Sequence, residues 1–217
     1  MNLEYTEVLL FLPAFHTYRF TTANYKKEHK TRKFVEEYTT KGMVNYGTIH
    51  RFLESIKKKL LKEISLNSNT LPYIRYILLD GGSSKNSLFL LTGHQKGMLL
   101  MNQIANKYTE DGSSFKVNQI SQHSLFENNE VSEFYNKFKS RLINFLKSEK
   151  VISNYELIDF TIRECFIPKN AKAIIKQLVD SKKVTIFEHD EEIKNQQKWA
   201  ISVDPKHETF IKWNSNE

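Results

Sequence analysis

Basic side chains are concentrated in one stretch of the sequence, where aromatic residues such as Tyr25 and Tyr46 lie between them. The stretch from Arg19 to Glu63 contains 12 Lys and Arg residues against 5 Asp and Glu. Cationic side chains can follow a phosphate backbone while exposed aromatic rings stack on bases, so the stretch predicts a DNA- or RNA-binding surface. The alternative is that the lysines are solvated helix faces and the aromatic residues belong to a core. The candidate contacts are Arg19, Lys26, Lys27, Lys30, Arg32, Lys33, Arg51, Lys57, Lys58, Lys59 and Lys62.

A second, smaller group of lysines lies nearer the C-terminus. Lys169, Lys172 and Lys176 are spaced i, i+3, i+7, so in a helix they share one face, opposite Ile174 and its apolar neighbours. A recognition helix needs such a cationic face to enter a groove and neutralise phosphates. The alternative is a solvated helix face, and the acidic run at residues 190–192 favours it, because a wing with those charges repels phosphate.

Two histidines are the candidates for catalysis or phosphate contact. His94 lies at the end of a predicted strand and either caps the helix that follows or contacts a ligand, and His16 follows the first predicted strand. The seven histidines are scattered, and no His-Glu-x-x-His spacing or Gly-x-Gly-x-x-Gly loop is present. We therefore predict no catalytic residue, no metal site and no cofactor, and the interpretation leans away from an enzyme.

The chemistry of the remaining residues favours the cytoplasm. Cys165 is the only cysteine, which excludes an internal disulfide and suits a reducing compartment. The N-terminal residues do not resemble a signal peptide, and no apolar window has the length of a membrane span. A net charge of +7 suggests an acidic partner. We expect a cytoplasmic protein without membrane contact.

Residues 134–203 have the pattern of a small helical domain that ends in a hairpin. Apolar residues recur at intervals of three and four through its first part, which is typical of an amphipathic helix, and the last part alternates around a polar tip. Three helices followed by a two-stranded wing predict a winged helix-turn-helix. The predicted elements are a helix carrying Phe134 to Leu146, helices at Asn154–Glu164 and Asn170–Ser181, and strands at Val184–Glu188 and Lys198–Val203.

The N-terminal half predicts an α/β layer. Thr6–Pro13 is a continuous apolar run, as expected of a strand covered on both faces, and residues 14–25 are expected to form a loop. Only a hairpin is available to pair with this strand, so we expect an open sheet edge that a protein partner or a second copy covers. The other predicted elements are helices at Lys26–Thr39 and Ile49–Ile64, a hairpin of Tyr73–Leu79 with Ser87–Thr92, and a helix at Gly97–Tyr108.

The order of these elements, together with the segment TGHQKGMLLM at Thr92–Met101, resembles the C-terminal half of the three-Cys-motif partner family. Members of that family are similar to methyltransferase-type Rossmann domains with an appended C-terminal helical unit. The resemblance implies a partial methyltransferase-like α/β domain at residues 1–115, a linker at 116–131 and a winged helix-turn-helix at 132–217. The cofactor-binding half of the family has no counterpart here, so no S-adenosylmethionine-binding residue is carried over.

Two functions of different class follow from these patterns. The first is a non-catalytic nucleic-acid-binding or interaction subunit of a larger assembly. The alternative is the C-terminal half of a split S-adenosylmethionine-dependent methyltransferase-like enzyme, whose cofactor half lies on another chain. For the fold we expect an α+β protein, with a partial Rossmann-like layer and an antiparallel hairpin followed by the winged helix-turn-helix.

Overall fold

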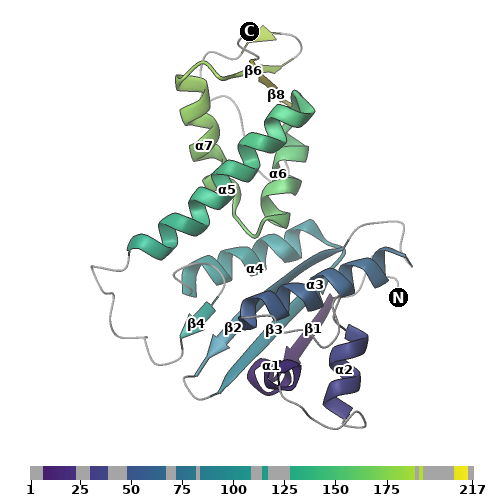
Figure 1. Cartoon of the computed structure of the whole chain (residues 1–217). Helices are drawn as coiled ribbons and strands as arrows, with labels where there is room; N and C mark the ends of the chain where they lie inside the picture. The colour runs from purple at the N-terminus through teal and green to yellow at the C-terminus, as the bar shows by residue number, and fades with distance from the viewer. Residues whose placement is uncertain are drawn as a thin grey trace. The chain divides into compact units, whose positions relative to one another are not determined.

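The computed structural model divides the chain into two compact units, residues 1–123 and 124–217. Each unit is described by itself (Figure 1). Both mix helices with a small sheet, so the fold is α+β, as predicted. The structure describes residues 7–22, 30–38, 48–66, 72–81, 84–108, 114–116, 128–188, 191–192 and 208–214.

In its described residues the first unit has one four-stranded sheet and four helices. The strand order is β1-β3-β2-β4, where β3 runs antiparallel to β1 and β2, and β4 runs parallel to β2. Three of the four strands therefore point the same way. The elements are β1 (Glu7–Leu12), α1 (Ala14–Thr22), α2 (Lys30–Tyr38), α3 (Ile49–Ser65), β2 (Tyr73–Asp80), β3 (Lys85–Thr92), α4 (Gln95–Tyr108) and β4 (Ser114–Lys116).

Helices cover both faces of this sheet. Phe52 and Leu53 of α3 are fully buried against the face that carries Phe89, and this core includes residues of α1 and α2. On the opposite face α4 packs on β2 and β3, and the buried Arg75 donates a hydrogen bond from Nη1 to Oδ1 of Asn102 at 2.6 Å. Figure 1 shows α3 and α4 on opposite sides of the sheet. The predicted hairpin and the helices after residue 49 and around residue 97 are confirmed.

Two expectations for the N-terminal half are wrong. The residues expected to form a loop after the first strand include helix α1, because Ala14 and Thr17 are buried and tertiary packing outweighs the low helix propensity of Thr and aromatic residues. The hydroxyl of Thr17 also bonds to the carbonyl of Pro13 at 2.9 Å. The first strand is not covered on both faces: β1 is an edge strand, and Leu9 and Phe11 are 63% and 56% exposed.

The second unit is a winged helix-turn-helix in its order of elements. Phe138, Leu142 and Leu146 of α5 form the stripe that the spacing predicted, and they pack with Ile174 and Ile175 of α7 in one core. Lys116, the last residue of β4, and the start of α5 fall within the stretch expected to be a linker. The elements are α5 (Asn128–Glu149), β5 (Val151–Ser153), α6 (Asn154–Arg163), α7 (Pro168–Asp180), β6 (Val184–Glu188), β7 (Glu191–Glu192) and β8 (Phe210–Trp213).

The sheet of this unit differs from the predicted two-stranded hairpin. Its order is β5-β8-β6-β7, so the C-terminal strand β8 lies between β5 and β6. Ile211 of β8 is fully buried between Ile152 and Ile186, its partners on either side. The predicted strand at Lys198–Val203 lies outside the described residues. Apolar residues of the tail, and not a second strand of the wing, therefore complete the described part of the core.

A candidate nucleic-acid interface

Helix α7 presents the second predicted group of lysines on its outer face. Lys169, Lys172 and Lys176 are all exposed, whereas Ala171, Ile174, Ile175 and Leu178 are buried on the opposite side. Ala173, between these lysines, is exposed too. The structure thus brings the three lysines together as the spacing predicted, on the helix that occupies the recognition position of a winged helix-turn-helix.

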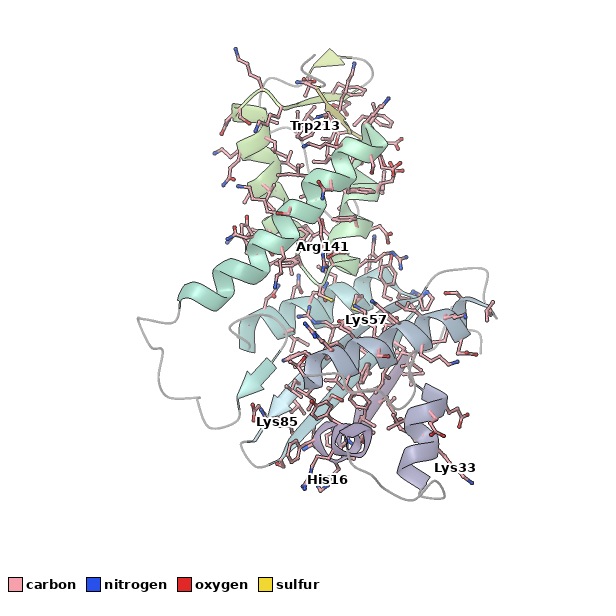
Figure 2. All side chains as sticks on the ribbon, viewed as in Figure 1. His16, Lys33, Lys57, Lys85, Arg141 and Trp213 are labelled. Atoms are coloured by element: carbon pink, nitrogen blue, oxygen red, sulfur yellow. The ribbon has the colours of Figure 1, made fainter. Side chains whose placement is uncertain are left out.

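The turn between α6 and α7 fixes where this helix begins. Pro168 is the first helical residue, where its missing N–H leaves no extra unsatisfied donor, and the amide of Ile167 donates to Oδ1 of Asn170 at 3.3 Å. Cys165 makes the turn with a φ of 68°. Arg141 of α5, labelled in Figure 2, holds the same turn through a 2.7 Å ion pair with Glu164. The N-terminal end of α7, where the helix dipole is positive, carries Lys169.

The wing adds negative charge to this unit. Phe187 and Glu188 of β6 pair with Glu192 and Glu191 of β7, so Glu188 and Glu191 are the last paired residues before the chain reverses, at the tip end of this hairpin. Asp190 lies outside the described residues. Glu188, Glu191 and Glu192 make this hairpin acidic in sequence, which argues against contact between phosphates and the wing.

Several lysines around β8 were not recognised in the sequence. Lys212 lies on the outer face of the sheet with Thr185 as its cross-strand partner, and the ammonium of Lys147 lies 5.3 Å from the ring centre of Trp213, labelled in Figure 2. Lys150 and Lys183 also lie next to β8, since their backbone carbonyls accept hydrogen bonds from the amides of residues 213 and 214. These positions are distant in sequence, so no local pattern could have grouped them.

Those predicted basic residues of the first unit that the structure describes are distributed over α1, α2 and α3. Figure 2 shows Lys33 on α2 and Lys57 on α3, and Arg19 of α1 lies 5.6 Å above the ring of Phe15. The side chains of Lys30 and Arg32 are not described, and Lys26 and Lys27 lie outside the described residues. The predicted contacts that are exposed are Arg19, Lys33, Arg51, Lys58 and Lys62, and those that are half-buried are Lys57 and Lys59.

One α3 lysine is neutralised by its own helix. Lys59 forms a 2.8 Å ion pair with Glu63, and this hydrogen bond and charge lower the pKa of the Glu63 carboxyl below its usual range. Arg51, Lys58 and Lys62 are exposed at i, i+7, i+11, so they share one side of α3. The local charge available to a partner is therefore concentrated on these three residues.

The two histidine candidates are in different places. His16 is exposed on α1, edge-on to Phe15 with ring centres 6.5 Å apart, and is labelled in Figure 2. His94 starts α4 through its backbone, since its carbonyl accepts from the amide of Met98 at 3.2 Å and its own amide donates to the hydroxyl of Thr92 at 2.9 Å. The structure does not bring the two histidines into one site, and the described residues contain no cluster of His, Cys, Asp or Glu suited to a metal ion.

Comparison with known proteins supports the winged helix-turn-helix. A family model described as a GMT-like wHTH domain matches residues 101–191, which begin within α4 and end in β7. No curated protein matches the chain, and no solved structure does. Within the described residues, every helix is too short or too polar to cross a membrane.

Proposed function

We propose that the chain binds nucleic acid through the outer face of α7. The observation that carries the proposal is the exposure of Lys169, Lys172 and Lys176 on one side of the helix that follows the turn of a winged helix-turn-helix. The buried isoleucines on the other side fix the orientation of the helix, so the lysines stay together. Lysines arranged in this way neutralise phosphates, and they do not by themselves distinguish DNA from RNA.

The acidic wing restricts how this unit meets a nucleic acid. Because the acidic strand β7 is the edge strand next to β6, a wing inserted beside the nucleic-acid backbone would bring negative charge close to phosphates. The proposed contact is therefore made by the helix, with the wing directed away. Three neutralised phosphates give a slope of log K against log salt of about −2.7 on duplex DNA.

The exposed side of α3 provides a second proposed phosphate-binding surface, on the first unit. Arg51, Lys58 and Lys62 form it, and Arg19 and Lys33 add charge on the neighbouring helices. The two units together offer more contacts than either alone, which raises affinity through effective concentration. We propose that the protein acts as a non-catalytic, cytoplasmic subunit of a larger assembly. The uncovered apolar edge of β1 supports association with another chain.

Charge reversal on α3 tests the second surface. The double variant Lys58→Glu/Lys62→Glu is expected to weaken binding to a labelled 20-nucleotide duplex by about thirtyfold, since each lost charged contact contributes on the order of 1 kcal/mol. Fluorescence anisotropy at 50 mM salt measures the change. The matched control Lys96→Glu/Lys107→Glu changes the net charge equally on exposed residues of α4. Equal weakening by both variants would show that only total charge matters and would contradict a surface on α3.

A further inference from the structure

Strand β1 exposes large apolar side chains on both of its faces. Leu9 pairs with Leu90, which also pairs with Arg75, so Leu9 lies on the face that α4 covers. Its neighbour Leu10 pairs with the buried Phe89 and lies on the face of α1 to α3. The exposed fractions are 63% for Leu9, 38% for Leu10 and 56% for Phe11. None of the helices that the structure describes covers the strand fully on either face.

Helix α4 extends this apolar surface. Its first turn lies against the start of β1, so closely that a side chain at Gly97 would clash with the carboxylate of Glu7. Ile104 is seven residues further on, two helical turns, and so lies on the same side of α4 as Gly97. Ile104 and Leu100 are 44% and 57% exposed. The apolar patch therefore includes residues of both β1 and α4.

The two edges of the sheet are protected very differently. The edge strand β4 has three residues and ends in Lys116, and a short strand with a lysine resists pairing with another chain. The edge strand β1 has six residues, EVLLFL, and carries no lysine or proline within its span. An apolar edge of this length is a site for strand pairing.

We propose that β1 pairs with β1 of a second copy of this chain, antiparallel, about a two-fold axis at Leu10. Opposite residues of an antiparallel pair lie on the same face, and this register places Leu9 opposite Phe11 and Val8 opposite Leu12. The two four-stranded sheets become one sheet of eight strands. Both of its remaining edges are β4, the strand that is already protected.

The charge on β1 is compatible with pairing to a second copy of the strand. Glu7 is the only charged residue of β1, and its Oε1 accepts from the Thr92 hydroxyl at 3.4 Å within its own unit. In the Leu10-centred register Glu7 lies opposite Pro13 of the other copy, beyond the paired segment, so no like charges meet. A register centred on Leu9 instead places Glu7 opposite Phe11 and pairs fewer apolar residues. The two-fold axis also generates the contact between Leu9 and Phe11 twice. Leu9 of each copy is therefore covered by Phe11 of the other.

Sedimentation velocity between 5 and 200 µM tests the association. The wild-type chain is expected to move from the 25.6 kDa monomer to a species of twice that mass, and Phe11→Lys to remain a monomer throughout. The control is Leu66→Lys, which also replaces an exposed apolar side chain by lysine, at a 72% exposed leucine of the turn that ends α3. This variant is expected to dimerise like the wild type. A wild-type monomer at 200 µM, or a dimer unchanged in Phe11→Lys, would overturn the proposal.

Disulfide trapping tests the register. In a Cys165→Ser background, Leu10→Cys brings the two thiols directly opposite one another, at a Cα separation of about 5 Å that a disulfide spans. Leu9→Cys leaves them offset by two residues and is expected to cross-link at least about tenfold more slowly. Equal rates at both positions would overturn the Leu10 axis. Higher salt is expected to preserve the dimer while it weakens nucleic-acid binding, so failure of one proposal is distinguishable from failure of the other.

Discussion

Replacing Lys169, Lys172 and Lys176 by Glu is expected to reduce affinity for nucleic acid at least about a hundredfold. Each lysine loses a charged contact that contributes on the order of 1 kcal/mol, and each glutamate adds repulsion from phosphate. All three side chains are exposed, so the variant is expected to retain the core around Ile174 and Ile175 and its helical circular dichroism. Anisotropy titration of duplex and single-stranded DNA and RNA at 50 mM salt measures the loss.

A matched triple variant separates position from total charge. Lys150, Lys183 and Lys212 are exposed in the same unit but lie around β8 and not on α7. Changing all three to Glu alters the net charge by the same amount and leaves the backbone hydrogen bonds of residues 150 and 183 in place. We expect a loss of less than about tenfold. A greater loss in this variant than in the α7 variant would place the interface on the sheet.

The largest stability effect is expected at Phe138. This side chain is 1% exposed, and its ring is stacked on Phe166 at 4.0 Å between centres and 15° between planes. Truncation to alanine removes a buried aromatic ring and leaves a cavity, so Phe138→Ala is expected to lower the free energy of unfolding by about 3–5 kcal/mol. Urea unfolding followed by circular dichroism and by hydrogen exchange of α6 and α7 measures the change.

An exposed aromatic residue of the same unit is the control for this substitution. Tyr155 on α6 is 46% exposed, and Tyr155→Ala is expected to change stability by less than about 0.5 kcal/mol. The loss at Phe138 is also expected to reduce nucleic-acid binding, because α7 packs on the same core. A change below about 1 kcal/mol in Phe138→Ala would contradict the packing of α5 against the turn before α7.

The C-terminal helices could be predicted because their signals are local. Apolar residues of α5 recur at helical spacing, Ser153 and Glu156 form a capping box at the start of α6, and Pro168 is suited to the first position of α7. The position of β8 could not be predicted, because it pairs with β5 over a long separation in sequence, Ile152 with Ile211. Strand order depends on such long-range pairing.

The N-terminal half shows what a composition pattern omits. The apolar run of β1 correctly indicated a strand, but the same run is expected of a central strand and of an edge strand that binds another chain. The exposure of Leu9 and Phe11 shows that, within a single copy of the chain, β1 is an edge strand and not a central one. Helix α1 was missed because its helical state depends on burial of Ala14 and Thr17 by other elements.

Part of the candidate interface could be predicted from the sequence, because some of its residues lie close together in the chain. Lys169, Lys172 and Lys176 share a helix, so their spacing is sufficient to group them. On α3 the spacing also indicated a cationic face, but only the structure shows that Lys59 is paired with Glu63 while Lys58 and Lys62 are exposed. Lysines around β8 come together through tertiary contacts and carried no local signal.

Salt dependence of the wild-type affinity is the most direct test of nucleic-acid binding. Anisotropy titrations of a labelled 20-nucleotide duplex between 50 and 200 mM salt give the slope of log K against log salt. We predict a slope of at least about −2.7 in magnitude for the wild type, and a smaller slope for the variant with Lys169, Lys172 and Lys176 changed to Glu. Absence of binding at 50 mM salt, to duplex or single-stranded DNA or RNA, would contradict the account.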